Sequence, residues 1–329
     1  MNFESVERIA AAILYEGYIL YPYRPTAIKN RQRWNFGTLY PRSYAEVQRP
    51  AEPYALHAEC LVVADSAAHL DVRISFLQLV RQQRSTAASL DSLHALSDVS
   101  LEWEEAIERT SEHRDLRLSD LIISPLRLSV RMGRNDVSGI QHAECSEELK
   151  AQLTIAIEAL TNGALKVSLD FENLSSIPDG AQASRKEVLP QSFVSAHVLL
   201  GIADGEFISL LDPAEIYSSA VAACHNVGVF PVLAGEEPDR SIMFCSPIIL
   251  YDYPRIAPES EGDFFDGTEM DEMLTLRVLT LTDAEKEQMR GGDPRARRIL
   301  ERTEALTAES MLRSHGVIRS LRDIRRTTE

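Results

Sequence analysis

Apolar and polar residues alternate most regularly on either side of the dipeptide Asn162-Gly163. Apolar residues occupy the odd positions of 153–157 and of 165–171, and polar or small residues occupy the positions between them. Alternation with a period of two predicts strands that bury one face and expose the other. Asn-Gly supplies the two residues with positive φ that a type I′ turn requires. The sequence therefore predicts a β-hairpin in an antiparallel sheet that is covered on one side.

Further segments rich in β-branched and apolar residues predict several short strands. Trp103–Thr110 fits either a strand or a helix. Short strands at this spacing are typical of a sandwich or a barrel rather than of alternating strands and helices. We therefore expect an α+β fold that is mainly β, namely an antiparallel β-sandwich or a partly closed barrel. The expected strands are 54–64, 70–80, 126–132, 193–202, 207–211, 227–232 and 242–251, with polar turns at 65–68 and 203–205.

Helical periodicity appears at the two ends of the chain. Apolar residues of 4–15 recur at helical spacing and predict an N-terminal amphipathic helix. Near the other end, three pairs have the spacing of helix starts and predict C-terminal helices. These pairs are Thr268 with Asp271, Thr282 with Glu285, and Asp293 with Pro294. We expect three parts: 1–53, a helix followed by an aromatic, basic and Pro-rich arm; 54–255, an antiparallel β-sandwich domain; and 256–329, an acidic loop with a C-terminal helical segment.

Composition narrows the class of protein. The 329 residues are 44% hydrophobic and 26% charged, which is typical of a globular protein with a sizeable core. A net charge of −16 argues against nucleic acid as a partner, because phosphate binding needs a basic surface. No apolar run reaches the length of a membrane span, and the first residues lack a signal-peptide pattern. Together with four cysteines in no regular framework, these features predict a cytoplasmic protein.

Rings and guanidinium groups are concentrated in the arm. Eight of the chain's 22 aromatic residues fall between Tyr15 and Tyr44, interleaved with four arginines and a lysine. Tyr, Trp and Arg are favoured anchors of binding surfaces, which indicates a site for a protein partner. Alternatively, tyrosines of such an arm pack against a sheet and bond through their hydroxyls. The candidate partner-binding residues are Tyr18, Tyr21, Tyr23, Arg24, Lys29, Arg33, Trp34, Phe36 and Tyr40.

The tetrapeptide His-Ala-Glu-Cys occurs at 57–60 and again at 142–145. Residues three apart in a strand point to opposite faces, so His57 and Cys60 can share an ion only if a bulge intervenes. The acidic loop at 259–272 offers other carboxylates, although their spacing differs from that of a calcium loop. No cofactor is predicted beyond a possible zinc, nickel or iron ion. The candidate metal ligands are His57, Cys60, His142, Cys145, Asp263, Asp266 and Glu269.

Motifs of catalysis give no catalytic residue. The pair Cys224-His225 is adjacent in sequence, which does not by itself orient an imidazole against a thiol. The chain has no Gly-x-Ser-x-Gly, no Walker loop and no Gly-x-Gly-x-x-Gly. Serine hydrolases, P-loop enzymes and Rossmann dehydrogenases therefore find no support, and a role other than catalysis is favoured.

Four stretches of the chain are long and specific. They are 14–24 with 33–39, Glu59–Val62, 195–213 (SAHVLLGIADGEFISLLDP), and 246–293, which contains SPIILYDYPRIAPES and FFDGTEMDEMLTLRVLTLTDAEK. Together they resemble uncharacterised proteins encoded in bacterial nickel–iron uptake hydrogenase gene clusters. The resemblance spans most of the chain except about 84–150. It implies an accessory role in making or assembling a hydrogenase and supplies no catalytic residue.

Three hypotheses follow from the sequence. The first is a non-enzymatic accessory protein that binds a hydrogenase subunit or a maturation factor through its arm. The second is a metal-handling or metal-dependent enzyme that uses some of the candidate ligands. The third is a protein that binds a small molecule in the mouth of a barrel-like sheet. The sequence leaves the oligomeric state open.

Overall fold

The computed structural model describes residues 2–23, 27, 30, 33, 35–81, 104–133, 147–256, 262, 264–265, 271–291 and 294–307. Contacts along the chain divide it into two compact units. The first unit combines Met1–Glu16 with Trp34–Arg255, and the second combines Gly17–Arg33 with Ile256–Glu329. No helix in the described ranges is both long and apolar enough to cross a membrane.

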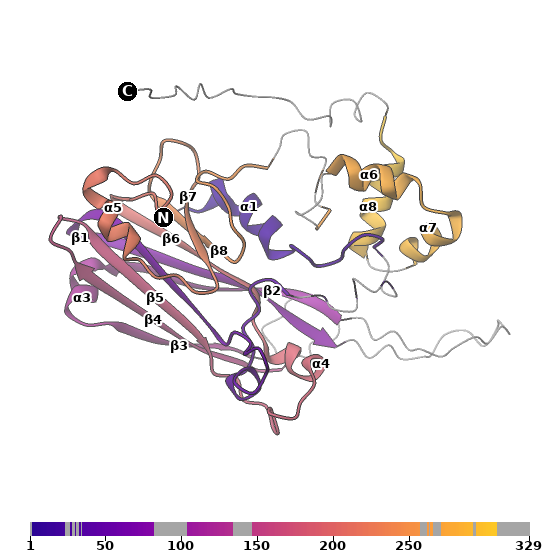
Figure 1. Ribbon diagram of the computed structural model, residues 1–329, viewed down its shortest axis with the longest axis horizontal. Coiled ribbons are helices and arrows are strands. Elements are labelled where there is room, and N and C mark those ends of the chain that lie inside the picture. Colours follow the sequence, from indigo (N-terminus) through magenta and orange to yellow (C-terminus); the bar gives the residue numbers. More distant parts are fainter. Residues whose placement is uncertain are drawn as a thin grey trace. The chain divides into compact units, whose positions relative to one another are not determined.

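The first unit is built on one antiparallel sheet of eight strands (Figure 1). The strand order is β3-β4-β5-β1-β6-β8-β7, and β2 pairs with β1 beside this path. Within the described residues the edge strands β3 and β7 do not pair, so the sheet is open. The strands are β1 (Ala55–Arg81), β2 (Glu104–Arg117), β3 (Leu126–Met132), β4 (Leu149–Ala159), β5 (Leu165–Asn173), β6 (Val194–Phe207), β7 (Phe230–Ala234) and β8 (Ile242–Ser246).

Along the chain, the helices of the first unit precede the strands or occur in the connections between them. The expected class, mainly β and antiparallel with an N-terminal helix and C-terminal helices, is confirmed, and the expected helix at 4–15 is α1. The helical elements of the first unit are α1 (Glu4–Leu14), α2 (Arg42–Ala45), α3 (Leu118–Ile123), α4 (Arg185–Val188), the 3-10 turn Leu189–Gln191, and α5 (Glu215–Ala222).

Strand β1 is the longest strand of the sheet and pairs with three others. Its first half pairs with β5, and its second half pairs with β2 along the same edge, while β6 follows its other edge. The predictions of turns at 65–68 and 203–205 were wrong, because β1 continues through the first range and β6 continues through the second. The register between β1 and β6 shifts there, and Asp204 has a φ of 61°. Turn-type polar residues at these positions form a bulge, which needs the same conformational freedom as a turn.

The predicted hairpin between β4 and β5 is confirmed, although its turn differs from the prediction. Ala159 pairs with Leu165, and the amide of Gly163 donates to the carbonyl of Leu160 at 3.2 Å. Gly163 has a φ of 82°, whereas Asn162 is not among the residues with positive φ. This is the three-residue loop in which a type I turn precedes a left-handed glycine. The odd positions of 153–157 and of 165–171 are buried as expected.

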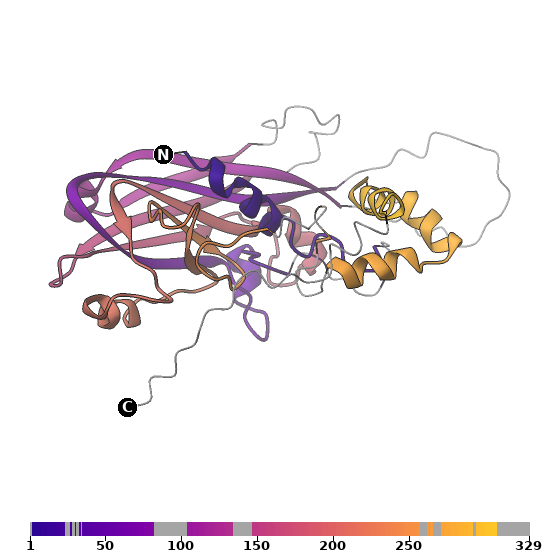
Figure 2. The same ribbon diagram turned by 90° about the horizontal axis from the view of Figure 1, so that it is seen from above.

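Two faces of the sheet are covered. The even positions of β1 and β6 and the odd positions of β4 and β5 form the main core, which includes a contact between Phe76 and Phe193 with centroids 4.6 Å apart. On the opposite face of β6, β8 and β7, helix α1 packs Phe3, Val6 and Ile13 against the sheet. Figures 1 and 2 both show α1 alongside these strands. The expected strand at 242–251 ends at Ser246, and the residues after it form an irregular segment.

The second unit combines the segment 17–33 with the C-terminal helices. Thr282 begins α7 with the predicted capping box, because its hydroxyl accepts from the Glu285 amide and the Glu285 carboxylate accepts from the Thr282 amide at 3.0 Å. The predicted start at Pro294 is also confirmed, whereas Thr268 lies outside the described residues. The helices are α6 (Asp271–Leu279), α7 (Asp283–Arg290) and α8 (Pro294–Glu304).

Candidate functional site

Three of the candidate partner-binding residues of the arm are buried in the second unit. Tyr18 is 1% exposed, Tyr23 is 0% exposed and Arg33 is 8% exposed. Within the second unit the guanidinium of Arg295 lies 4.9 Å from the centroid of the Tyr18 ring, and the Tyr23 hydroxyl donates to the carbonyl of Phe264 at 3.1 Å. Burial of these rings and of Arg33 agrees with the alternative interpretation, in which the tyrosines of the arm pack inside the protein. Partner binding by the arm stays a prediction.

The other arm residues divide into three groups. Tyr40 is buried in the first unit, and its hydroxyl accepts a hydrogen bond from Arg185 Nε at 2.9 Å. Tyr21 and Phe36 are half-buried, with Arg277 stacked 5.6 Å from the Tyr21 ring. Arg24, Lys29 and Trp34 lie outside the described residues.

The candidate metal ligands are not assembled in the part of the chain that the structure describes. His57 is half-buried on the outer face of β1, whereas Cys60 is buried in the main core on the inner face, as their spacing predicted. Among the described residues no group of three His, Cys, Asp or Glu side chains is placed to hold a metal ion. His142, Cys145, Asp263, Asp266 and Glu269 lie outside those residues.

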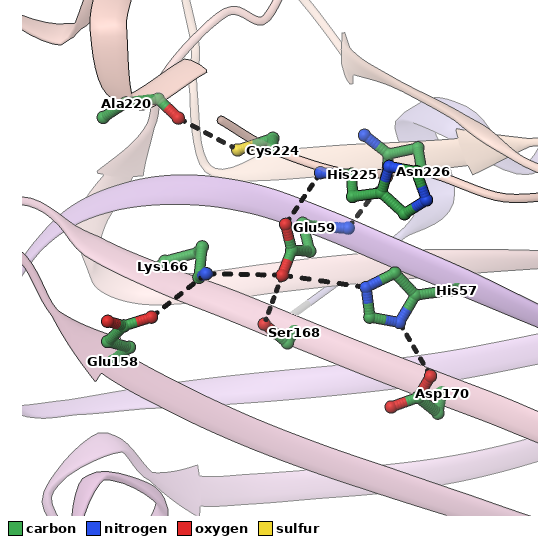
Figure 3. Close-up of polar contacts among 10 residues, drawn as sticks. All are labelled: His57, Glu59, Glu158, Lys166, Ser168, Asp170, Ala220, Cys224, His225 and Asn226. Atoms are coloured by element: carbon green, nitrogen blue, oxygen red, sulfur yellow. Dashed lines mark hydrogen bonds and ion pairs between the residues drawn. The ribbon is translucent and has the colours of Figure 1, made fainter. Parts of the chain in front are cut away.

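A polar cluster, here named the Glu59 cluster, occupies the outer face of β1 and β5 (Figure 3). Odd positions of β1 and even positions of β5 point away from the core, which brings their polar side chains together across the register pair Glu59–Ser168. The backbone that follows α5 completes the cluster. Its members are His57, Glu59, Lys166, Ser168, Asp170, His225 and Asn226.

The carboxylate of Glu59 is the centre of the cluster. It accepts from the His225 amide at 2.7 Å and from the Ser168 hydroxyl at 3.2 Å, and Lys166 Nζ lies 3.4 Å away. Burial alone would raise the pKa of Glu59, but the His225 amide and Lys166 outweigh it and lower this pKa. Lys166 also pairs with Glu158 at 3.0 Å, and this bond is the first cause of its raised pKa. The ionised pair is therefore the favoured state.

His57 lies between two carboxylates. Its Nδ1 is 2.7 Å from Asp170 Oδ1, and its Nε2 is 3.7 Å from Glu59 Oε1 (Figure 3). Because an ionised carboxylate can only accept, Nδ1 of His57 is the donor in its contact with Asp170. The arrangement orients the imidazole, and in the described structure the ring stands beside His225, with centroids 6.4 Å apart.

Cys224 is not an activated nucleophile. Burial, reinforced by the charge of Glu59, raises the pKa of its thiol to about 11. The thiol therefore stays protonated at neutral pH, and its sulfur lies 3.5 Å from the Ala220 carbonyl.

The cluster fastens the segment after α5 to the free edge of β1. The amides of His57 and Val227 each donate to the other residue's carbonyl, at 2.9 and 2.8 Å. The Glu59 amide donates to the side chain of Asn226 at 2.8 Å, and the Glu59 carboxylate takes the His225 amide. Since each of these bonds joins β1 to residues 225–227, the Glu59 cluster acts as a staple for this segment.

A second site joins two segments that are far apart in the sequence. Ser209 donates from its hydroxyl to the Asp252 carboxylate at 2.5 Å, and the other Asp252 oxygen accepts from the Leu233 amide at 2.8 Å. The Ser209 hydroxyl in turn accepts from the amides of Leu211 and Asp212, at 3.1 and 2.8 Å. We call this arrangement the Ser209–Asp252 clasp.

Beside the clasp, apolar side chains project into solvent. Leu211 is 55% exposed, Ile249 is 77% exposed and Tyr251 is 86% exposed. Leu211 lies two residues from Ser209, and Tyr251 directly precedes Asp252. Single exposed apolar side chains are normal at a protein surface, whereas a contiguous patch of them marks an interaction site.

Sequence reasoning singled out His57 and the Cys224-His225 pair, but it missed the Glu59 cluster as a whole and the Ser209–Asp252 clasp. Glu59 lies in the quoted Glu59–Val62 stretch, and Ser209 and Asp252 lie in two others, but none of the three was singled out. The available signal for the Glu59 cluster was an acidic residue within a mostly apolar strand, because such a residue usually needs polar partners when it is buried. The Ser209–Asp252 contact joins residues 43 positions apart, and no local pattern predicts such a pairing.

Comparison with known proteins assigns no family, since no model of a protein family matches the chain and no curated protein matches it.

Proposed function

We propose that this chain is a non-enzymatic accessory protein that acts in the assembly or maturation of a nickel–iron hydrogenase. In this proposal it binds a hydrogenase subunit or a maturation factor through a surface on the first unit. The surface lies beside the Ser209–Asp252 clasp and replaces the arm as the binding site.

The clasp is the observation that carries the proposal. Segments 195–213 and 246–293 both resemble hydrogenase-cluster proteins, and the 2.5 Å bond between Ser209 and Asp252 joins them. Both segments also expose apolar side chains beside this bond. Burial of such side chains on binding would stabilise a complex, because apolar surface removed from water contributes about 25 cal/mol per Å².

The chemistry of the Glu59 cluster supports binding over catalysis. Its central carboxylate is occupied by an amide, a hydroxyl and an ammonium group, and the neighbouring thiol of Cys224 is protonated at neutral pH. A group engaged in this way stabilises a segment of chain. The cluster therefore supplies the rigidity that a binding surface needs.

Affinity purification from hydrogenase-expressing cells tests the proposal. The tagged chain is compared with the double variant Ile249→Ser/Tyr251→Ser and with the control Ile123→Ser, which alters an 84% exposed residue on α3. We expect hydrogenase subunits or maturation factors to copurify with the unchanged chain and the control, and to be depleted with the double variant. Recovery of no hydrogenase component with the unchanged chain would refute the proposal.

A further inference from the structure

We infer that the outer edge of strand β3 accepts an extended segment of a partner protein in which apolar and acidic residues alternate. The segment would pair with β3 as a further strand of the sheet. This inference goes beyond the proposed function and concerns a different surface, because β3 and β7 stand at opposite ends of the strand order and the Ser209–Asp252 clasp is attached to β7.

Strand β3 has a free edge in the part of the chain that the structure describes. Its residues Leu126–Met132 pair with Leu149–Ile155 of β4, and no other described segment hydrogen-bonds to their backbone. In Figure 1, β5, β4 and β3 follow one another toward the margin of the sheet. Every second residue of such a strand points its amide and carbonyl away from the neighbouring strand, so β3 offers these groups to an added strand.

Strands β7 and β2 are less suited to such pairing. On β7, the Leu233 amide donates to Asp252 and the Leu233 carbonyl accepts from the Tyr253 amide, so the chain's own residues cover this edge. On β2, eight of the 14 residues are Asp, Glu or Arg, and Asp115 has a φ of 61°, which interrupts the extended backbone. Strand β3 is therefore the edge that fits a partner strand best.

The apolar side chains of β3 indicate one half of the partner's chemistry. Leu126, Leu128 and Met132 are half-buried against the main core, and Val130 between them is buried. These even positions share the inner face of the sheet, because successive residues of a strand point to opposite faces. An added strand would cover the apolar surface that they still expose, which favours apolar residues at every second position of the partner segment.

Charge indicates the other half. Arg127, Ser129 and Arg131 alternate with the apolar residues and are exposed on the outer face. Their neighbour Lys150 on β4 pairs with Glu148 at 3.0 Å, whereas Arg127 and Arg131 form no ion pair with the described residues. Opposite charges directly across two strands stabilise their pairing, so we expect acidic residues opposite both arginines.

A second copy of this chain fits the edge less well. Antiparallel pairing of two β3 strands about Ser129 would place Arg127 of one copy opposite Arg131 of the other. Like charges that lie directly opposite one another destabilise such a pair. The side chains of β3 therefore favour a segment of a different protein.

Peptides test this inference on the purified full chain by fluorescence anisotropy. The probe is fluorescein-labelled Val-Glu-Val-Thr-Val-Glu-Val, compared with a peptide in which Lys replaces both Glu residues. A third peptide has Pro-Pro in place of the central Thr-Val, because one of any two adjacent amides must face β3 and Pro has no amide hydrogen. We expect the Glu peptide to bind best, and its binding to weaken as salt screens the exposed charges.

Reversal of the charges on β3 should reverse the preference. In Arg127→Glu/Arg131→Glu, affinity for the Glu peptide should fall about tenfold, because opposite-charge contacts become like-charge contacts. Affinity for the Lys peptide should rise in the same variant, a gain that a loss of folding does not produce. The control Arg8→Glu/Arg298→Glu makes the same change of charge at exposed arginines of α1 and α8, and should bind as the unchanged chain does.

Hydrogen exchange shows whether the peptide pairs with the strand. Binding of the Glu peptide should slow exchange at 126–132, measured by mass spectrometry, because outward amides of β3 become hydrogen-bonded. Unchanged exchange there would overturn the inference, as would equal binding of the three peptides or an equal loss in the control variant. Complete protection of 126–132 in the free chain, whether it sediments as a monomer or as a dimer, would also overturn it, because the edge would already be occupied. Each of these results leaves the hydrogenase proposal standing, since copurification through the surface beside the clasp is measured separately.

Discussion

The hydroxyl of Ser209 donates to the carboxylate of Asp252 at 2.5 Å and thereby joins segments 43 residues apart. The same carboxylate holds the Leu233 amide on the edge strand of the sheet. One acidic side chain thus fixes a turn, a sheet edge and the segment that exposes Ile249 and Tyr251.

Replacement of Asp252 by Ala should lower the free energy of unfolding of the first unit by about 2 kcal/mol, because it leaves the Leu233 amide and the Ser209 hydroxyl without their acceptor. Urea unfolding followed by circular dichroism measures this change. Asp212→Ala, at an exposed neighbouring carboxylate, should change it by less than about 0.5 kcal/mol. Equal effects of the two variants would contradict the role of the clasp.

Replacement of Glu59 by Ala should release the segment after α5. The His225 amide and Lys166 lose their acceptor, so we expect faster hydrogen exchange at residues 225–227, measured by mass spectrometry. Gln at the same position keeps an acceptor for the amide and should restore much of the protection. Unchanged exchange in Glu59→Ala would show that the cluster is not a staple.

Glu59 also makes a prediction about pH. The folded state lowers its pKa below the usual 4.5, so its ionised form contributes stability above that pH. This contribution is lost as the pH falls below 4.5 towards the lowered value. The free energy of unfolding can be measured by urea unfolding at pH values from about 3 to about 7. As the pH falls, it should decline less steeply in Glu59→Gln than in the unchanged chain.

His197 is a second group that should make the folded state less stable in acid. Its Nδ1 donates to the Ser195 carbonyl at 3.0 Å, and its buried Nε2 has no hydrogen-bond partner among the described residues. Burial lowers its pKa from 6.5 to about 4, so the unfolded chain binds a proton between these values that the folded chain does not. Stability should therefore decline as the pH falls from 6.5 to 4, by roughly 3 kcal/mol in total. His197→Gln should flatten this decline, and an unchanged slope would contradict the assignment.

Tyr18 tests the structural role of the arm. Its ring is buried among Phe265, Arg33 and Arg295, with the Phe265 centroid 5.7 Å away. Tyr18→Ala should destabilise the second unit by about 3 kcal/mol, as truncation of a buried aromatic ring does. Limited proteolysis should then cleave α6 to α8 faster, whereas Tyr251→Ala at the exposed ring should leave the cleavage rate unchanged. Resistance of Tyr18→Ala to the protease would restore the arm as a candidate surface.

Sequence patterns predicted the elements whose cause is local. The alternation at 165–171 and the capping box at Thr282 each depend on neighbouring residues, and both are found in the structure. Asp204 was misread, because turns and bulges use the same residue types and only the pairing of β1 with β6 distinguishes them.

The candidate sites required long-range information. Rings and guanidinium groups in the arm suit a surface or a packed interior equally well, and the helices that bury Tyr18 lie more than 250 positions further along the chain. The Glu59 cluster could be anticipated only in part, because alternation along β1 and β5 places Glu59 and Ser168 on the outer face. Their partner His225 comes from an irregular segment whose position follows from the fold alone.

Hydrogenase activity in a strain that lacks this protein tests the proposed role in hydrogenase assembly most directly. Activity should be lost in the deletion strain and restored by the unchanged gene and by the control Ile123→Ser. The variant Leu211→Ser/Tyr251→Ser should accumulate as folded protein and yet fail to restore activity. Full activity in the deletion strain, or full rescue by this variant, would contradict the proposal that a surface beside the Ser209–Asp252 clasp binds a component of hydrogenase assembly.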